Sequence, residues 1–84
     1  GINEWLTKTE KIKIYPNPVD SFITIGLKEN TPFDYRIFDT TGKLVQSESS
    51  LNNNIISVSS LSRGVYQIFI RQNGKMFNSK LVKN

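Results

Sequence analysis

Residues 60–83 read S-L-S-R-G-V-Y-Q-I-F-I-R-Q-N-G-K-M-F-N-S-K-L-V-K, and this stretch decides the fold. It contains two β-rich runs joined at Asn73 and Gly74. Asn-Gly between two such runs is typical of a two-residue type I′ hairpin, because both turn residues need positive φ. With these two residues as the loop, Tyr66 faces Leu81 across the hairpin, and the register of every other pair follows.

This register assigns the hairpin side chains to two faces. One face is apolar apart from one hydroxyl and is expected to pack on a core, whereas the other is mixed and is expected to be mostly solvated. A slip of one residue would place Gln67 and Lys80 in the core, so the register is well specified. The inward face carries Tyr66, Ile68, Ile70, Phe77, Ser79 and Leu81, and the mixed face carries Val65, Gln67, Phe69, Arg71, Met76, Asn78, Lys80 and Val82.

Five shorter runs precede the hairpin and are expected to be strands, at residues 11–15, 21–27, 33–38, 43–48 and 55–59. Turn signals separate them at intervals of about eight to twelve residues, and no helical period is visible. This pattern predicts an all-β fold, a small antiparallel β-sandwich of about seven strands, with a small barrel as the alternative. The side chains expected to face the core are Ile12, Ile14, Ile23, Ile25, Leu27, Phe33, Tyr35, Ile37, Ile56 and Val58.

Two connections between these runs have clear turn chemistry. Pro16, Asn17 and Pro18 predict a rigid corner, because proline lacks an amide donor and pushes the residue before it toward extended geometry. Asp39 suits the first position of a type I turn, and Gly42 at the fourth position supplies the left-handed residue that closes such a hairpin.

The 84 residues are enough for one small domain. We interpret residues 1–10 as a leader or linker and residues 11–84 as the folded domain, within a fragment of a longer protein because the chain lacks an initial methionine. Trp5 is expected to pack on a sheet edge rather than to serve as a ligand platform. Neither a membrane span nor a signal peptide is visible, and without cysteine the domain has no disulfides.

Charge is distributed unevenly along the chain, whose formal net charge is +4. After Glu48 there is no acidic residue. One interpretation is a solvated sheet face that keeps edge strands from pairing with neighbours, and the other is a docking surface for an acidic partner. The basic residues of this half are Arg63, Arg71, Lys75, Lys80 and Lys83.

Catalysis has little support, because the chain has no histidine or cysteine and its seven carboxylates are scattered. Neither a nucleophile elbow nor a Gly-rich phosphate loop is present. We therefore expect no enzyme, no cofactor and no transition-metal site. Oxygen ligands suffice for calcium, and the candidates for such a site are Asp20 and Asp39 with loop asparagines.

Two binding functions are alternatives. Aromatic side chains on the strands of a basic protein are typical of platforms for single-stranded nucleic acid. Only Phe38 and Phe69 are expected to face outward, however, so no nucleic-acid binding is expected. A carbohydrate-binding sandwich would use Trp5 or Tyr15 as its platform.

Four blocks of the sequence together resemble a known family. In chain order they are Tyr15-Pro16-Asn17-Pro18, Asp39-Thr40-Thr41-Gly42-Lys43-Leu44-Val45, Leu61-Ser62-Arg63-Gly64-Val65-Tyr66 and Lys80-Leu81-Val82-Lys83. Over residues 11–84 the chain resembles the type A C-terminal sorting domain of the type IX secretion system, found in Bacteroidetes bacteria. Asn84, after the last lysine, is compatible with that family.

The resemblance implies an immunoglobulin-like sandwich at the C-terminus of a larger secreted cargo protein. Such a precursor reaches the periplasm by an N-terminal signal peptide, and the folded domain is then recognised by the outer-membrane translocon and its shuttle protein. A sortase removes the domain, within the linker before residue 11, and the cargo is released or attached at the cell surface. The alternative function is an accessory immunoglobulin-like module that binds glycan or mediates adhesion.

The site residues follow from the same blocks, except for Asn73 and Gly74, which follow from the hairpin turn. Leu81 is expected to be buried, while its neighbours point outward on what is expected to be an edge strand. Because exposed edge strands recruit partner strands, we hypothesise that the secretion machinery reads this terminal strand. Weak self-association through an uncovered edge is left open, and no membrane insertion is expected. Partner recognition is assigned to Lys80, Leu81, Val82, Lys83, Pro16, Asn17 and Pro18, and a structural role to Asp39, Gly42, Lys43, Leu61, Gly64, Tyr66, Asn73 and Gly74.

Overall fold

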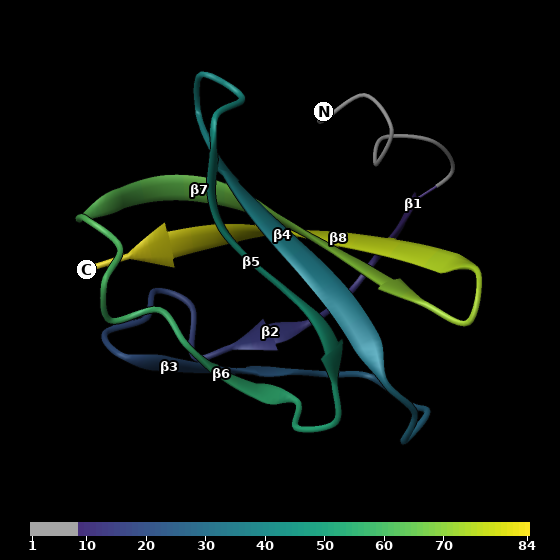
Figure 1. Ribbon diagram of the computed structural model, residues 1–84. Helices are drawn as coiled ribbons and strands as arrows, with labels where there is room; N and C mark the ends of the chain where they lie inside the picture. The colour runs from purple at the N-terminus through teal and green to yellow at the C-terminus, as the bar shows by residue number, and fades with distance from the viewer. Residues whose placement is uncertain (1–8) are drawn as a thin grey trace.

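Two β-sheets pack face to face in the computed structural model, which describes residues 9–84 (Figure 1). The larger sheet has the strand order β1-β8-β7-β4-β5, and the smaller has the order β2-β3-β6. The prediction of an all-β sandwich is therefore confirmed. The strands are β1 (Thr9–Lys11), β2 (Ile14–Tyr15), β3 (Phe22–Ile25), β4 (Phe33–Asp39), β5 (Leu44–Leu51), β6 (Ile55–Ser57), β7 (Gly64–Gln72) and β8 (Lys75–Lys83).

The terminal hairpin has the predicted register. Tyr66 pairs with Leu81 and Ile70 with Phe77, and the turn residue Asn73 has a φ of 50°. Gly74 follows with a φ of 76°, so both turn residues have the positive φ of a type I′ turn. The Asn-Gly pair thus positions the two longest strands of the domain.

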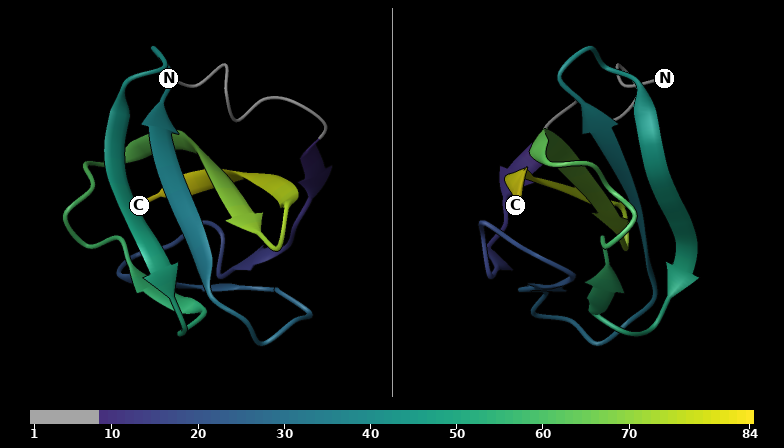
Figure 2. Two further views of the ribbon diagram at one scale, coloured as in Figure 1. Left: turned by 45° about the vertical axis from the view of Figure 1, so that its right-hand side comes forward. Right: turned by 90° about the vertical axis from the view of Figure 1, so that its left-hand side faces the viewer.

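The core lies between the two sheets and consists of the side chains that the period of two directs inward. Phe77, Tyr66, Ile12 and Leu27 are only partly buried and pack against it. In Figure 2, β1 and β5 lie on opposite sides of the molecule, as expected for the two ends of the larger sheet. The buried core comprises Ile14, Val19, Ile23, Ile25, Phe33, Tyr35, Ile37, Ile56, Val58, Leu61, Ile68, Ile70 and Leu81.

The prediction of one continuous strand at residues 11–15 is wrong, because the chain passes from the larger sheet to the smaller one within this range. β1 pairs in parallel with β8, whereas β2 pairs with β3 in the other sheet. The amide of Ile12 still donates to the carbonyl of Asn78 at 3.0 Å, and the carbonyl of Lys13 accepts from Gly26 at 2.8 Å. Thr9 and Glu10, which the sequence assigned to the linker, belong to β1. The interpretation of Trp5 lies outside the described residues.

The mixed face of the hairpin is less solvated than predicted. Phe69 is buried in a second small cluster with Phe38, and their rings meet edge to face with centroids 5.8 Å apart. Asn78 is also buried, and its amide group accepts from Lys11 Nζ at 3.0 Å and from Gln67 Nε2 at 3.2 Å and donates to Thr9. Phe38 and Phe69 therefore lie on the outer face as expected, but the expectation that they are exposed is wrong, and both are unavailable for stacking with bases.

Candidate recognition site

The corner at residues 16–18 lies against the last strand of the chain. The side-chain amide of Asn17 donates to the carbonyl of Lys80 at 2.8 Å and accepts from the amide of Val82 at 2.9 Å. These two bonds are those that a neighbouring strand would make, so the Asn17 side chain substitutes for a peptide group. Pro16 and Pro18, whose peptide bonds are both cis, have no amide hydrogen to offer.

The contact continues beyond the corner to the end of the chain. The amide of Val19 donates to the carbonyl of Val82 at 2.8 Å, and the amide of Asn84 donates to the carbonyl of Val19 at 2.9 Å. The side chain of Asn84 also donates to Asp20 Oδ1 at 3.0 Å. Val19 itself is buried in the core, so one apolar side chain anchors the whole corner.

The expectation that the terminal strand is an open edge is wrong. β1 pairs with the first half of β8, at residues 76–78, and the corner occupies the second half. β8 therefore lies between β1 and β7 in the larger sheet. A partner strand cannot add to this edge unless the corner first moves away.

Several side chains of the two blocks nevertheless face solvent. Lys80 is exposed, and so are the two prolines of the corner. Lys83 is half-buried, and its Nζ donates to the carbonyl of Asn84 at 3.2 Å. Leu81 has no exposed surface, so it supports this site from the core and cannot contact a partner. We call the set Pro16, Asn17, Pro18, Lys80, Val82 and Lys83 the corner–tail surface.

The middle motif forms a separate turn between β4 and β5. Asp39 Oδ1 accepts from the amide of Thr41 at 2.9 Å and from the amide of Lys43 at 3.0 Å. The hydroxyl of Thr41 donates to the same oxygen at 2.6 Å, and these donors lower the pKa of Asp39. Gly42 has a φ of 85°, which agrees with the predicted left-handed closing residue. These contacts are local, and none reaches the corner–tail surface.

The third motif fixes the entry into β7. Leu61 is buried, and its amide donates to the carbonyl of Val58 at 3.0 Å. The Tyr66 hydroxyl donates to the carbonyl of Ser62 at 2.6 Å, which holds the loop before Gly64 against the sheet. At the other end of the hairpin, Asn73 Nδ2 donates to Thr31 Oγ1 at 2.9 Å. Leu61 and Tyr66 therefore fix the loop before β7, and Asn73 ties the hairpin turn to the connection between β3 and β4.

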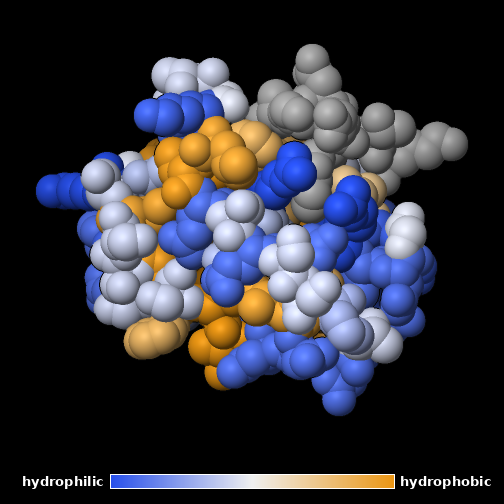
Figure 3. Space-filling view, in the orientation of Figure 1, coloured by the Kyte–Doolittle hydropathy of each residue, from blue (hydrophilic) through white to orange (hydrophobic). Residues whose placement is uncertain are grey.

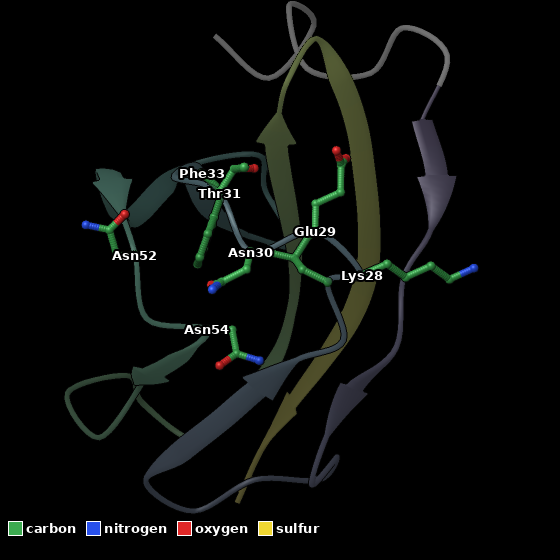
Figure 4. A pocket seen from close by; sticks show the side chains of 8 residues that line it. Lys28, Glu29, Asn30, Thr31, Phe33, Asn52 and Asn54 are labelled. Carbon is green, nitrogen blue, oxygen red and sulfur yellow. The ribbon is translucent and has the colours of Figure 1, made fainter.

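Two hollows lie at the end of the sandwich where this hairpin turns. One, of about 140 Å³, is lined by residues 27–31 with Phe33, Asn52 and Asn54. Figure 4 shows the side chain of Lys28 pointing away from the other lining residues, and Asn54 Nδ2 donates to the carbonyl of Ile25 at 3.0 Å. The other is a groove of about 510 Å³ whose lining includes Ile12, Leu27 and Phe77. Neither arrangement places a nucleophile beside a general base.

The calcium candidates do not come together. Asp20 and Asp39 bind different partners, and among residues 9–84 no three acidic side chains are grouped so that they could hold a metal ion. Within the same residues there is also no helix of the length and apolar character that crossing a membrane requires.

The sequence interpretation missed one group of exposed side chains, on the outer face of the smaller sheet. Tyr15, Phe22 and Ile55 are exposed there, although all three are large and apolar or aromatic. The available signal was a phenylalanine at residue 22 and an isoleucine at residue 55, each at the outward position of a half-buried strand. Val19, directly after the corner, was missed as a core residue because it stands outside every strand pattern.

Comparison with known proteins gives one family. The family model described as "Secretion system C-terminal sorting domain" matches residues 13–84. A search of curated proteins found no match. The matched residues include both parts of the corner–tail surface.

Proposed function

This chain belongs to the family of secretion system C-terminal sorting domains, and we propose that the type IX machinery recognises it through the corner–tail surface of the folded domain. As a member of that family it is the sorting signal of a larger cargo protein, which crosses the outer membrane to the cell surface or the extracellular space. The family is not one of known enzymes, and the match gives no support to a glycan-binding or adhesion module.

The observation that carries the proposal is the contact of Asn17 with β8. The side chain of Asn17 bonds Lys80 and Val82, which come 63 and 65 positions later in the sequence. It therefore brings the opening motif and the basic tail into one surface. Because the backbone of the tail is occupied by these bonds, a partner meets the side chains of Lys80 and Lys83 beside the two prolines. The secretion machinery therefore recognises the surface of the folded domain and not an unpaired strand.

The finer steps of the pathway follow the family resemblance. The outer-membrane translocon and its shuttle protein bind the folded domain, and a sortase cleaves the chain in the linker before the sandwich. The cargo is then released or attached at the surface. The domain performs no catalysis itself and needs no cofactor, because its task is complete once it has been bound and removed.

The test uses a secreted reporter fused in front of residues 1–84 and expressed in a bacterium with a type IX system. Deleting residues 81–84 is a poor test, because the loss of buried Leu81 would unfold the domain. The sharper variant is Lys80→Glu with Lys83→Glu, which changes no buried core residue and reverses the charge of the tail. The matched control is Lys28→Glu with Lys75→Glu, two exposed lysines outside the corner–tail surface and outside the sequence motifs.

We expect the Lys80/Lys83 pair to reduce export of the reporter by at least about fivefold, because contacts of a partner with the tail are replaced by charge repulsion. The control pair should be exported like the unchanged fusion. Normal export of the Lys80→Glu, Lys83→Glu fusion would overturn the assignment of recognition to this surface.

A further inference from the structure

The outer face of the smaller sheet carries an apolar surface that the corner–tail surface does not account for. Six large hydrophobic side chains are exposed among residues 9–84, and three of them lie on this face. Their exposed fractions are 45% for Tyr15, 59% for Phe22 and 51% for Ile55. None of the three is needed to fill the core, because the inward neighbours Ile14, Ile23 and Ile56 do so.

The pairing register makes these side chains neighbours. Thr24 lies between Tyr15 on one side and Ile55 on the other, so the three form one row across the sheet. Phe22 lies two residues before Thr24 and therefore on the same face, diagonal to Ile55. Figure 3 shows apolar side chains at the surface over β3 and β6, along the lower rim of that view. We call Tyr15, Phe22, Thr24 and Ile55 the outer apolar face.

The chemistry of the outer apolar face resembles the core of a protein interface. Such cores are enriched in aromatic side chains and depleted of charge, with charged residues at the rim. Lys13 is exposed and directly precedes β2, and β2, β3 and β6 contain no acidic residue. The exposed carboxylate before β3, that of Asp20, accepts from the side chain of Asn84. Charge complementarity therefore selects a partner with a carboxylate beside its apolar side chains.

The position of this face also points to the partner. Tyr15 directly precedes Pro16, so the outer apolar face adjoins the corner–tail surface along the chain. One partner protein can therefore contact both surfaces. The other exposed apolar side chains, Leu44, Val45 and Val65, lie on strands of the larger sheet.

We propose that the outer apolar face, with Lys13 at its rim, is a docking surface for a protein of the type IX apparatus that presents apolar side chains beside a carboxylate. This inference rests on the proposed function, since it adds a second contact for the same machinery. The two surfaces differ in chemistry, because the tail offers cations and the outer face offers aromatic and aliphatic area. Together they allow the machinery to distinguish this folded domain from an unfolded basic tail.

The first experiment uses the same reporter fusion with Phe22→Ser and Ile55→Ser. We expect export to fall by at least about fivefold, because buried aromatic and aliphatic anchors dominate the energy of interfaces. The control is Leu44→Ser with Val45→Ser, which removes two exposed apolar side chains from β5 and should leave export unchanged. Circular dichroism and urea unfolding of both purified variants verify that the fold is kept.

The outcomes separate the two proposals. Failure of the unchanged fusion to be exported contradicts the proposed function itself. Export of the unchanged fusion together with normal export of the Phe22→Ser, Ile55→Ser fusion overturns only the docking surface. Equal losses in this pair and in the Leu44, Val45 control also overturn it, because the effect would then follow exposed apolar area anywhere on the domain.

A second measurement does not depend on how well the serine variants fold. A photoreactive phenylalanine analogue is placed at Phe22 in the exported fusion, and at Leu44 in the control. We expect a cross-link from residue 22, but not from residue 44, to an outer-membrane protein of the type IX apparatus identified by mass spectrometry. Cross-links only to a second copy, to the reporter or to nothing would overturn the docking surface.

Discussion

The two ends of the larger sheet present different edges. At one end β8 is followed by β1, and the remaining length of β8 is occupied by the side chain of Asn17 and by Val19. At the other end no strand of residues 9–84 pairs with the outer edge of β5. The edge that carries the family's tail motif is thus the covered one. A β-strand motif at the end of a chain therefore does not imply that a partner protein adds a strand beside it.

The open edge has its own protection. The pairing of β5 with β4 shifts register between Phe33 and Tyr35 and again between Ile37 and Phe38. Such irregularities twist an edge and interrupt the row of amides and carbonyls that a second chain would need. Gln46 on β5 also reaches across to the other sheet, where its Nε2 donates to the carbonyl of Ser57 at 2.8 Å.

The largest expected effect is at the covered edge. Leu81→Ala removes a side chain with no exposed surface from β8 and should lower the free energy of unfolding by about 2–5 kcal/mol. Val45→Ala on β5 is the control, and because Val45 is 38% exposed its change should stay within about 0.5 kcal/mol. Urea unfolding followed by circular dichroism measures both. Similar losses in the two variants would contradict the contrast between the edges.

Asn17→Ala should cost about 1–2 kcal/mol, because it removes two hydrogen bonds from the backbone of β8. Asn17→Asp sharpens the test, since a carboxylate still accepts from the amide of Val82 but cannot donate to the carbonyl of Lys80. We expect this variant to be less stable than the unchanged protein as well. Native-state hydrogen exchange at the Val82 amide should accelerate in the alanine variant, and unchanged exchange would contradict the role of the Asn17 side chain.

At the open edge, Tyr35→Phe should cost about 1 kcal/mol near neutral pH. The buried Tyr35 hydroxyl donates to Glu48 Oε1 and accepts from Gln46 Nε2, each at 2.8 Å. Burial, with the nearby Glu48, raises the pKa of Tyr35 to about 12 from an ordinary value of 10.0. Because the folded state favours the protonated phenol, this contribution is complete below pH 10.0 and is lost as the pH rises toward 12.

Phenolate absorbance during an alkaline titration measures this directly. One tyrosine of the folded protein should titrate late, and the late phase should be missing in Tyr35→Phe. A titration of the unchanged protein without this late phase, or a late phase that persists in Tyr35→Phe, would contradict the buried hydrogen-bonded phenol beside β5.

The smallest expected effect concerns Asp34 on β4, which bonds both the irregular end of β5 and Arg71 on β7. Asp34 accepts from the amide of Ser50 at 2.9 Å and forms an ion pair with Arg71 at 3.1 Å. The Ser50 amide, followed by Arg71, lowers the pKa of Asp34 from its ordinary value of 3.8. A depressed folded-state pKa stabilises the fold above pH 3.8, and this stability is lost as the pH falls through the lower folded value.

Asp34→Asn should therefore cost less than about 1 kcal/mol near neutral pH, because the ion pair is at the surface. Its stability should also fall less steeply than that of the unchanged protein below pH 3.8. Urea unfolding across this acid range measures the difference. Parallel stability curves for the two proteins would contradict the coupling of Asp34 to the end of β5.

The sequence predicts the hairpin better than it predicts the edges. Asn73 and Gly74 determine every pair of β7 and β8, because a two-residue loop leaves no freedom of register. The position of Asn17 over Lys80 and Val82 was not predictable in this way, since nothing local specifies a side chain that bonds a strand far along the chain. The sequence analysis therefore expected the terminal strand to be an open edge, whereas the side chain of Asn17 covers it.

Burial on the second face of the hairpin shows a related limit. The alternation of side chains assigns Phe69 and Asn78 to the outer face correctly, yet both are buried there. A period of two tells which side a residue occupies, but it does not tell whether that side is covered. The same reason explains why the exposure of Phe22 and Ile55 emerged only from the structure.

The position of β8 between β1 and β7 has a consequence for how the precursor is made. A polypeptide that stops before residue 75, through early termination or proteolysis, lacks the strand that those two neighbours share. The corner–tail surface cannot then form, because β8, to which the side chain of Asn17 bonds, is missing. If the type IX machinery recognises the corner–tail surface as proposed, a precursor truncated before residue 75 should not be exported.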